Sequence, residues 1–178
     1  MSEKSQCVLL AEYNRLMNGR IIEASAGLSV AGLAEDKGAF FSSVIGTLNH
    51  IMIGDILWLK RFASHPSAYV SLEPLSKIKK PDRLDLVLFA DLSVFAEERE
   101  VLDSIIIAWC ADLKEVDLDQ PLGYTSHNGE RHKKRMGDLV LHMFLHQVHH
   151  RGQITTLLSQ AGIDFGETDL PEIVPDEV

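Results

Sequence analysis

Apolar side chains recur three and four positions apart over four long segments of the chain, and this spacing indicates one face of an α-helix. The segments run from about Cys7 to Ala26, from Ser42 or Ser43 to Ala63, from Asp82 to Leu113, and from Gly137 to Ala161. Four helices of about twenty residues each predict an all-α four-helix bundle. The link of residues 64–81 is long enough to cross the bundle, so the pattern alone leaves the order of the helices open.

Residues that begin helices stand at two of these boundaries. Ser42 and Ser43 are predicted to cap the second helix, because a serine hydroxyl accepts a hydrogen bond from a free backbone N–H at a helix start. Asp82 or Asp85 is predicted to cap the third helix in the same way. We interpret both serines as caps rather than as nucleophiles.

The segment before the last helix has a different pattern. Residues 120–135 contain alternating Leu122, Tyr124 and Ser126, followed by Asn128-Gly129. Asn-Gly between short extended runs is typical of a hairpin, because both residues accept a positive φ. The sequence therefore predicts a small hairpin or extended excursion here. The tail from Asp164 onward is expected to be irregular and to lie on the surface.

Length, charge and cysteine content narrow the class of protein. A chain of 178 residues suits one domain, which we take as residues 1–178. The formal net charge of -9 makes nucleic acid an unfavourable partner, because phosphate backbones are negative. The chain has no apolar run of membrane-spanning length and no secretory layout at its start, so no membrane partner and a cytoplasmic location are expected. Two distant cysteines exclude a disulfide framework.

Five of the eight histidines lie in or near the last helix: His132, His142, His146, His149 and His150. His146 and His150 are four apart, so they share a helix face with Cβ atoms about 6 Å apart. Two imidazoles so placed can bind one ion at about 2.1 Å, as zinc prefers. Helix angle ranks this pair first, then His142 as a substitute or supporting residue, then His149, which turns away. The alternative is a set of solvated polar side chains.

A third nitrogen ligand is offered by His50 in the second helix. Gly46 and Gly54 lie four residues on either side of it. Glycine costs about 1 kcal/mol relative to alanine inside a helix, so two glycines indicate either space kept open at His50 or close helix packing. Three histidine ligands leave a coordination position for water or substrate, which is typical of catalytic zinc.

Charged residues outside the histidine cluster are expected to have structural roles. Asp55 and Arg151 lie in apolar helix stretches, and buried charges are normally paired, so we expect them to pair with each other or with Asn14. Ordinary solvated charges are the alternative. The run Glu97–Glu100 is predicted to be a solvated helix face, and Trp58 to lie in the core or in a pocket wall.

Several motifs together resemble the DinB family of DinB/YfiT-like metalloenzymes. They are Tyr13-Asn14, Gly46-Thr47-Leu48-Asn49-His50, Asp55, Trp58-Leu59, His146-Gln147-Val148-His149-His150-Arg151-Gly152-Gln153, Gln160-Ala161-Gly162 and Asp169-Leu170-Pro171. The resemblance covers nearly the whole chain. It implies an up-down-down-up four-helix bundle, often dimeric, with a zinc or nickel ion held by His50, His146 and His150.

The resemblance implies a specific set of site residues, but it leaves several reactions open. The resemblance implies that relatives of this chain include thiol-dependent S-transferases and proteins that are named for DNA-damage induction. We therefore expect a metal-dependent enzyme that joins a low-molecular-weight thiol to a small-molecule substrate. A metal-dependent hydrolase, a non-catalytic metal-binding stress-response or interaction protein, and a small-molecule carrier are the alternatives. A second apolar sector on the last helix predicts a homodimer contact; its members are Leu141, Phe144, Leu145 and Val148.

Overall fold

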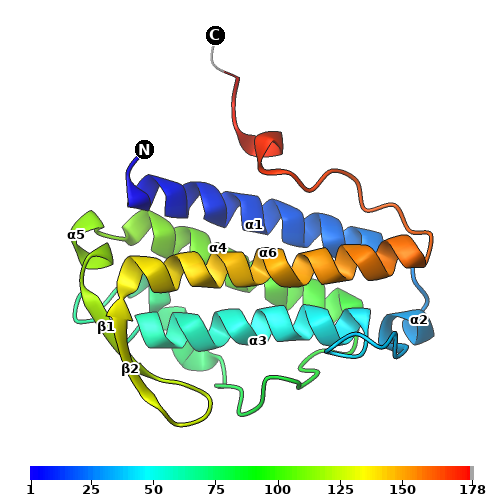
Figure 1. Ribbon diagram of the computed structural model, residues 1–178, viewed down its shortest axis with the longest axis horizontal. Coiled ribbons are helices and arrows are strands. Elements are labelled where there is room, and N and C mark those ends of the chain that lie inside the picture. The colour runs from blue at the N-terminus through cyan, green and yellow to red at the C-terminus, as the bar shows by residue number, and fades with distance from the viewer. Residues whose placement is uncertain (177–178) are drawn as a thin grey trace.

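The computed structural model describes residues 1–176, so the last two positions of the expected domain, 177 and 178, lie outside the described residues. The described chain is mostly helical and carries one small two-stranded sheet, in agreement with the expected fold class. Its long helices are α1 (Glu3–Ser25), α3 (Val44–Phe62), α4 (Leu92–Asp112) and α6 (Met136–Gln160). They lie side by side, with α1 against α4 and α6, and α3 against α6 (Figure 1). The shorter helices are α2 (Val30–Ala34), η1 (Val70–Lys77), α5 (Glu115–Leu118) and η2 (Leu170–Ile173).

Three of the four long helices lie close to their predicted bounds. The Ser43 hydroxyl accepts a hydrogen bond from the Gly46 N–H and caps α3 as predicted, whereas Ser42 precedes the helix with a φ of 63°. α1 begins earlier than predicted, because the Ser2 hydroxyl caps it. α6 agrees with its prediction to within one residue at each end.

The predicted start of the third helix is wrong. α4 begins after Asp91, whose carboxylate accepts hydrogen bonds from the first free N–H groups of the helix, and neither Asp82 nor Asp85 is a cap. The preceding segment is held away from helical geometry by contacts with α3. The Asn49 side chain donates to the Phe89 carbonyl and accepts from the Phe89 N–H, both at 2.9 Å. A side chain thus takes the backbone groups that a helix would need.

The predicted hairpin is confirmed. β1 (Pro121–Thr125) and β2 (Arg131–Arg135) pair antiparallel, with Pro121 opposite Arg135. Gly129 in the turn has a φ of 85°, which is the conformation that favours glycine. β2 leads directly into α6, so the hairpin lies beside the beginning of α6 and the end of α3 (Figure 1).

A continuous apolar core fills the space between the long helices. Trp58 is only 9% exposed and belongs to this core. Cys7 and Cys110 are both buried and free, so the expectation of no disulfide holds for the described chain. No helix of residues 1–176 is long and apolar enough to cross a membrane.

A buried polar network also runs through the core, and it corrects two predictions. Asp55 pairs with Arg99 at 2.6 Å rather than with Arg151, and Arg99 also pairs with Asp103 at 2.7 Å. Arg99 is 2% exposed, although its acidic neighbours in the run Glu97–Glu100 are exposed as predicted. The register of α4 against α3 turns this one residue of the run inward, where it balances two buried carboxylates.

Arg151 makes the other predicted contact. Its guanidinium donates to the Asn14 side-chain oxygen on α1 at 2.7 Å, and also to Asn18 and Gln147. These hydrogen bonds tie α6 to α1 one residue after His150, so they fix the position of the helix that carries two of the three histidines.

Candidate metal centre

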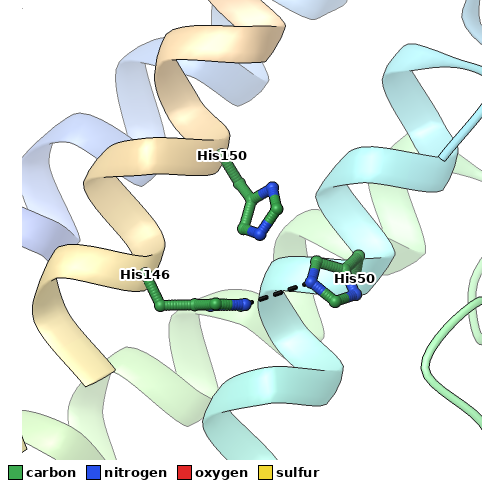
Figure 2. Close-up of side chains that lie close together, drawn as sticks. All are labelled: His50, His146 and His150. Carbon is green, nitrogen blue, oxygen red and sulfur yellow. Dashed lines mark hydrogen bonds between the residues drawn. The ribbon is translucent and has the colours of Figure 1, made fainter. Parts of the chain in front are cut away.

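The three histidines that the sequence singles out come together from two helices. His50 projects from α3, and His146 and His150 project from successive turns of α6, so that the three rings point toward one another (Figure 2). One ring nitrogen of each lies within 4.8 Å of the others. The structure thus places a nitrogen donor from a facing helix opposite an i,i+4 pair.

The closest approach in this cluster joins Nε2 of His50 and Nε2 of His146, which lie 3.1 Å apart (Figure 2). Two nitrogens that each lie about 2.1 Å from one ion, at an angle between octahedral and tetrahedral, are separated by about 3.0–3.4 Å. The observed separation therefore fits two ligands of a single ion.

Hydrogen bonds at the far nitrogen orient two of the rings. The Nδ1–H of His50 donates to the backbone carbonyl of Leu84 at 2.9 Å. The Nδ1–H of His150 donates to Oε1 of Gln153 at 2.8 Å. A proton on Nδ1 leaves the lone pair on Nε2, and this is the usual way in which a protein fixes a metal-binding tautomer.

All three imidazoles are held in the neutral form. Burial, with the neighbouring histidines adding to it, lowers the pKa of His146 to about 3. Burial also lowers the pKa of His50 and of His150. Neutral imidazole is the form that binds a metal ion, because protonation removes the lone pair.

The contacts of the two ring nitrogens of His146 are compatible with a bound cation. Its Nδ1 is buried and has no hydrogen-bond partner within the described chain. Its Nε2 faces the lone pair of His50 at 3.1 Å. A proton on Nε2 of His146 makes this contact a hydrogen bond to His50. A divalent ion that replaces this proton turns both nitrogens into ligands.

The two glycines beside His50 serve different purposes. A Cβ atom at Gly54 would lie 2.7 Å from Cε1 of His146, so the absent side chain makes room for that ring. A Cβ at Gly46 would lie 2.2 Å from the Phe41 carbonyl oxygen, so here glycine permits a loop to approach α3. The close-packing alternative therefore holds at both glycines, because the His146 ring fills the space at Gly54 and the Phe41 backbone fills the space at Gly46.

The remaining histidines of α6 lie outside the cluster, as their ranking predicted. His149 is exposed and accepts a hydrogen bond from the Gln153 amide at 3.3 Å. His142 packs against Trp58, with ring centroids 5.2 Å apart, and its ring lies 6.1 Å from that of His146. His142 therefore lies beside the site rather than in it.

Three contributors to the site were not predicted from the sequence. The Leu84 carbonyl has no side-chain signature, so no pattern could have identified it. Gln153 lies three residues after His150 on the same helix, which is a spacing that could have indicated the contact. Phe41 stacks on His50 with ring centroids 3.6 Å apart and meets His150 edge-on at 5.5 Å, thereby covering one side of the cluster.

Comparison with known proteins identifies the family of the chain. The sequence profile described as the DinB family matches residues 1–174. The chain belongs to the DinB family. Over 162 residues it is 26% identical to Protein DinB of Bacillus subtilis (strain 168), a match that covers 90% of this chain and 88% of that protein. No solved structure matches the chain. The DinB resemblance seen in the motifs is thus confirmed over almost the whole length.

Proposed function

We propose that His50, His146 and His150 hold one divalent metal ion of borderline softness, zinc or nickel. The observation that carries the proposal is the convergence of three imidazoles from two helices, with one ring nitrogen of each within 4.8 Å of the others. An all-nitrogen donor set suits zinc and nickel better than calcium or magnesium, which prefer oxygen. Three protein ligands leave room for a fourth from solvent or substrate.

The reaction that we propose is the transfer of a low-molecular-weight thiol to an electrophilic small molecule. A bound divalent ion lowers the pKa of a thiol or water molecule that reaches it, so that the nucleophilic anion is present near neutral pH. In the reaction the thiol loses its proton to solvent, a sulfur–carbon bond forms and the bond from carbon to the leaving group breaks. The leaving group departs with the electron pair of that bond.

The chain's own residues have defined tasks in this scheme. Leu84 and Gln153 fix the tautomers of His50 and His150, so the ligands need no rearrangement. Phe41 excludes water from one side of the cluster. Asp55 is the acidic residue next to Gly54, but it is fully buried and paired with Arg99. We therefore assign no general base among the described residues.

An activity assay with and without a chelator tests the proposed function. The purified protein is supplied with a sugar-linked cysteine thiol and a chromogenic aryl halide, and the loss of free thiol is followed. Turnover that stops on chelation and returns with added zinc or nickel supports the proposal. A rate that chelation leaves unchanged contradicts it. Release of product without consumption of thiol would favour a metal-dependent hydrolase instead.

The assembly that we propose has two levels. The four long helices form the up-down-down-up bundle expected of the family, which the course of the chain in Figure 1 supports. Two copies then associate through the exposed apolar strip of α6, which consists of Leu141, Leu145 and Val148. Phe144, predicted to share this sector, is instead 1% exposed and belongs to the core. Sedimentation that shows a monomer at all concentrations would contradict the dimer.

A further inference from the structure

A cavity of about 310 Å³ lies between the end of α3, the segment 80–84 and the end of β1. Its lining is rich in basic side chains, with Asp82 as the acidic member; the basic or titratable nitrogen groups belong to Arg61, Lys80, Arg83 and His127. This lining is unusual in a chain whose formal net charge is -9. The cavity could not be predicted from local sequence patterns, because three separate segments of the chain contribute to it.

Arg61 is the most informative residue of the lining. Its Cζ lies 4.4 Å from the ring centroid of Trp58 and 5.1 Å from that of Tyr124, so two aromatic rings hold the guanidinium in place. Within residues 1–176 the guanidinium makes one hydrogen bond to protein, from Nη2 to the Thr125 carbonyl at 3.3 Å. Among the described residues, no carboxylate lies within 4.0 Å of it to form an ion pair.

A half-buried guanidinium without a counter-ion is unfavourable, and burial indeed lowers the pKa of Arg61. Its planar fork matches the two oxygens of a carboxylate or a phosphate. Arg83 contributes less, because Asp85 pairs with it at 2.6 Å. Lys80 has no ion pair within the part of the chain that the structure describes, and its charge adds to that of Arg61.

The cavity is linked to the three histidines in two ways. Leu84 lines the cavity and also accepts the hydrogen bond from His50. Gly54, Trp58 and Arg61 follow His50 along one face of α3, at spacings of three and four residues. Arg61 lies seven positions after Gly54, which corresponds to about 10 Å along the helix axis. A small molecule that reaches from the histidines to Arg61 would therefore need a length of about 10 Å.

We propose that the cavity binds the anionic end, a carboxylate or a phosphate, of the small molecule whose reactive end lies at His50, His146 and His150. Arg61 is the residue that determines this specificity. The inference rests on the proposed function, because it assigns the class of thiol or substrate which that site accepts. It makes the substrate an elongated anion rather than a neutral compound.

Lys60 provides a matched control for Arg61. Both residues lie in the last turn of α3, where a positive charge is favourable for any helix. Lys60, however, donates to the Leu75 carbonyl at 2.7 Å and does not line the cavity. An effect of Arg61→Gln that Lys60→Gln does not share therefore reports on the cavity and not on the helix end.

The test compares two probes of equal length on the full chain loaded with zinc. 8-Mercaptooctanoate carries a thiol and a carboxylate about 10 Å apart, and 8-mercaptooctan-1-ol lacks the charge. Calorimetry at low salt is expected to show about tenfold or tighter binding of the acid, as a charged hydrogen bond provides. This ratio should persist in Lys60→Gln and fall to about one in Arg61→Gln. 8-Mercaptooctyl phosphate shows which anionic group binds more tightly.

Equal affinities of the acid and the alcohol in the wild type, or an unchanged ratio in a folded Arg61→Gln variant, would overturn the proposal. Failure of the proposed function looks different, because then neither thiol binds the metal-loaded protein. In that case inorganic phosphate alone is titrated against wild type and Arg61→Gln. Binding that depends on Arg61 upholds the anion cavity, and its absence overturns the cavity as well.

Discussion

A Cβ atom placed on Gly54 would come within 2.7 Å of Cε1 of His146. The His146 ring of α6 thus occupies the volume that a side chain at this position of α3 would fill. Gly54→Ala should therefore push His146 out of the cluster and weaken zinc binding by about 10- to 100-fold, as the loss of a supporting contact does. Competition with a fluorescent zinc chelator measures the change.

Gly19→Ala is the control for this variant. Gly19 lies within α1, and a Cβ there has no heavy atom within 4 Å. The substitution should raise the free energy of unfolding by up to about 1 kcal/mol through helix propensity and leave zinc affinity unchanged. Equal zinc affinity in Gly54→Ala and Gly19→Ala would show that His146 is not a ligand.

Gln153 should matter to the metal although it does not touch it. Its Oε1 accepts a hydrogen bond from the Nδ1–H of His150 and so keeps the lone pair on Nε2. Gln153→Leu removes that acceptor, and zinc affinity should fall about tenfold or more. Ser159→Ala, at an exposed position of the same helix, should change the affinity little. A similar loss in both variants would mean that the effect comes from the helix and not from the His150 tautomer.

The buried Asp55–Arg99–Asp103 cluster should dominate stability among the ion pairs. Both pairs of this cluster are at most 3% exposed. Arg99→Met leaves two carboxylates buried without a cation and should cost about 3–5 kcal/mol of unfolding free energy. The exposed Arg83–Asp85 pair is the control, because Arg83→Met should cost less than about 1 kcal/mol. Urea unfolding measures both, and comparable losses would contradict the role given to Arg99.

Metal-free protein should lose stability in acid through His146. Its folded pKa of about 3 lies below the ordinary value of 6.5, so the unfolded chain binds more protons between these values. The contribution of His146 is therefore complete above about pH 6.5 and is lost as the pH falls toward 3. Asp55, whose pKa burial raises to about 6, acts in the opposite direction.

Comparison with His146→Gln isolates the histidine, because Asp55 is present in both proteins. The unfolding free energy of the variant, followed by urea titration from pH 7 to pH 4, should decline less steeply than that of the wild type. Parallel curves would show that His146 titrates normally in the folded protein, which would contradict its burial as a neutral imidazole.

Local patterns predicted much of the fold, because helix periodicity and the Asn128-Gly129 turn depend on nearby residues alone. The predicted start of α4 was wrong because it depends on residues that are distant in the sequence. Residues before Asp91 have apolar spacing compatible with a helix, but Asn49 and His50 on α3 bind the backbone of this segment. No property of the segment itself reveals such a contact between distant parts of the chain.

In the candidate site, too, some residues could be predicted from local patterns and others could not. His146 and His150 follow from a spacing of four, and the glycines on either side of His50 drew attention to the third residue. The pairing of Asp55 with Arg99 could not be predicted, because Arg99 lies in an acidic run that is typical of a solvated helix face. Arg61 was overlooked because its cavity exists only once the hairpin and residues 80–84 lie beside α3.

The metal content of untagged protein, purified without a nickel column, tests the central claim most directly. Elemental analysis should find about one zinc or nickel ion per chain in the wild type, and the same in His149→Ala. The ion should be absent from His50→Ala, His146→Ala and His150→Ala variants that retain their helical circular dichroism. A wild-type protein that holds no divalent ion and takes none up, or three variants that hold as much as the wild type, would contradict the account.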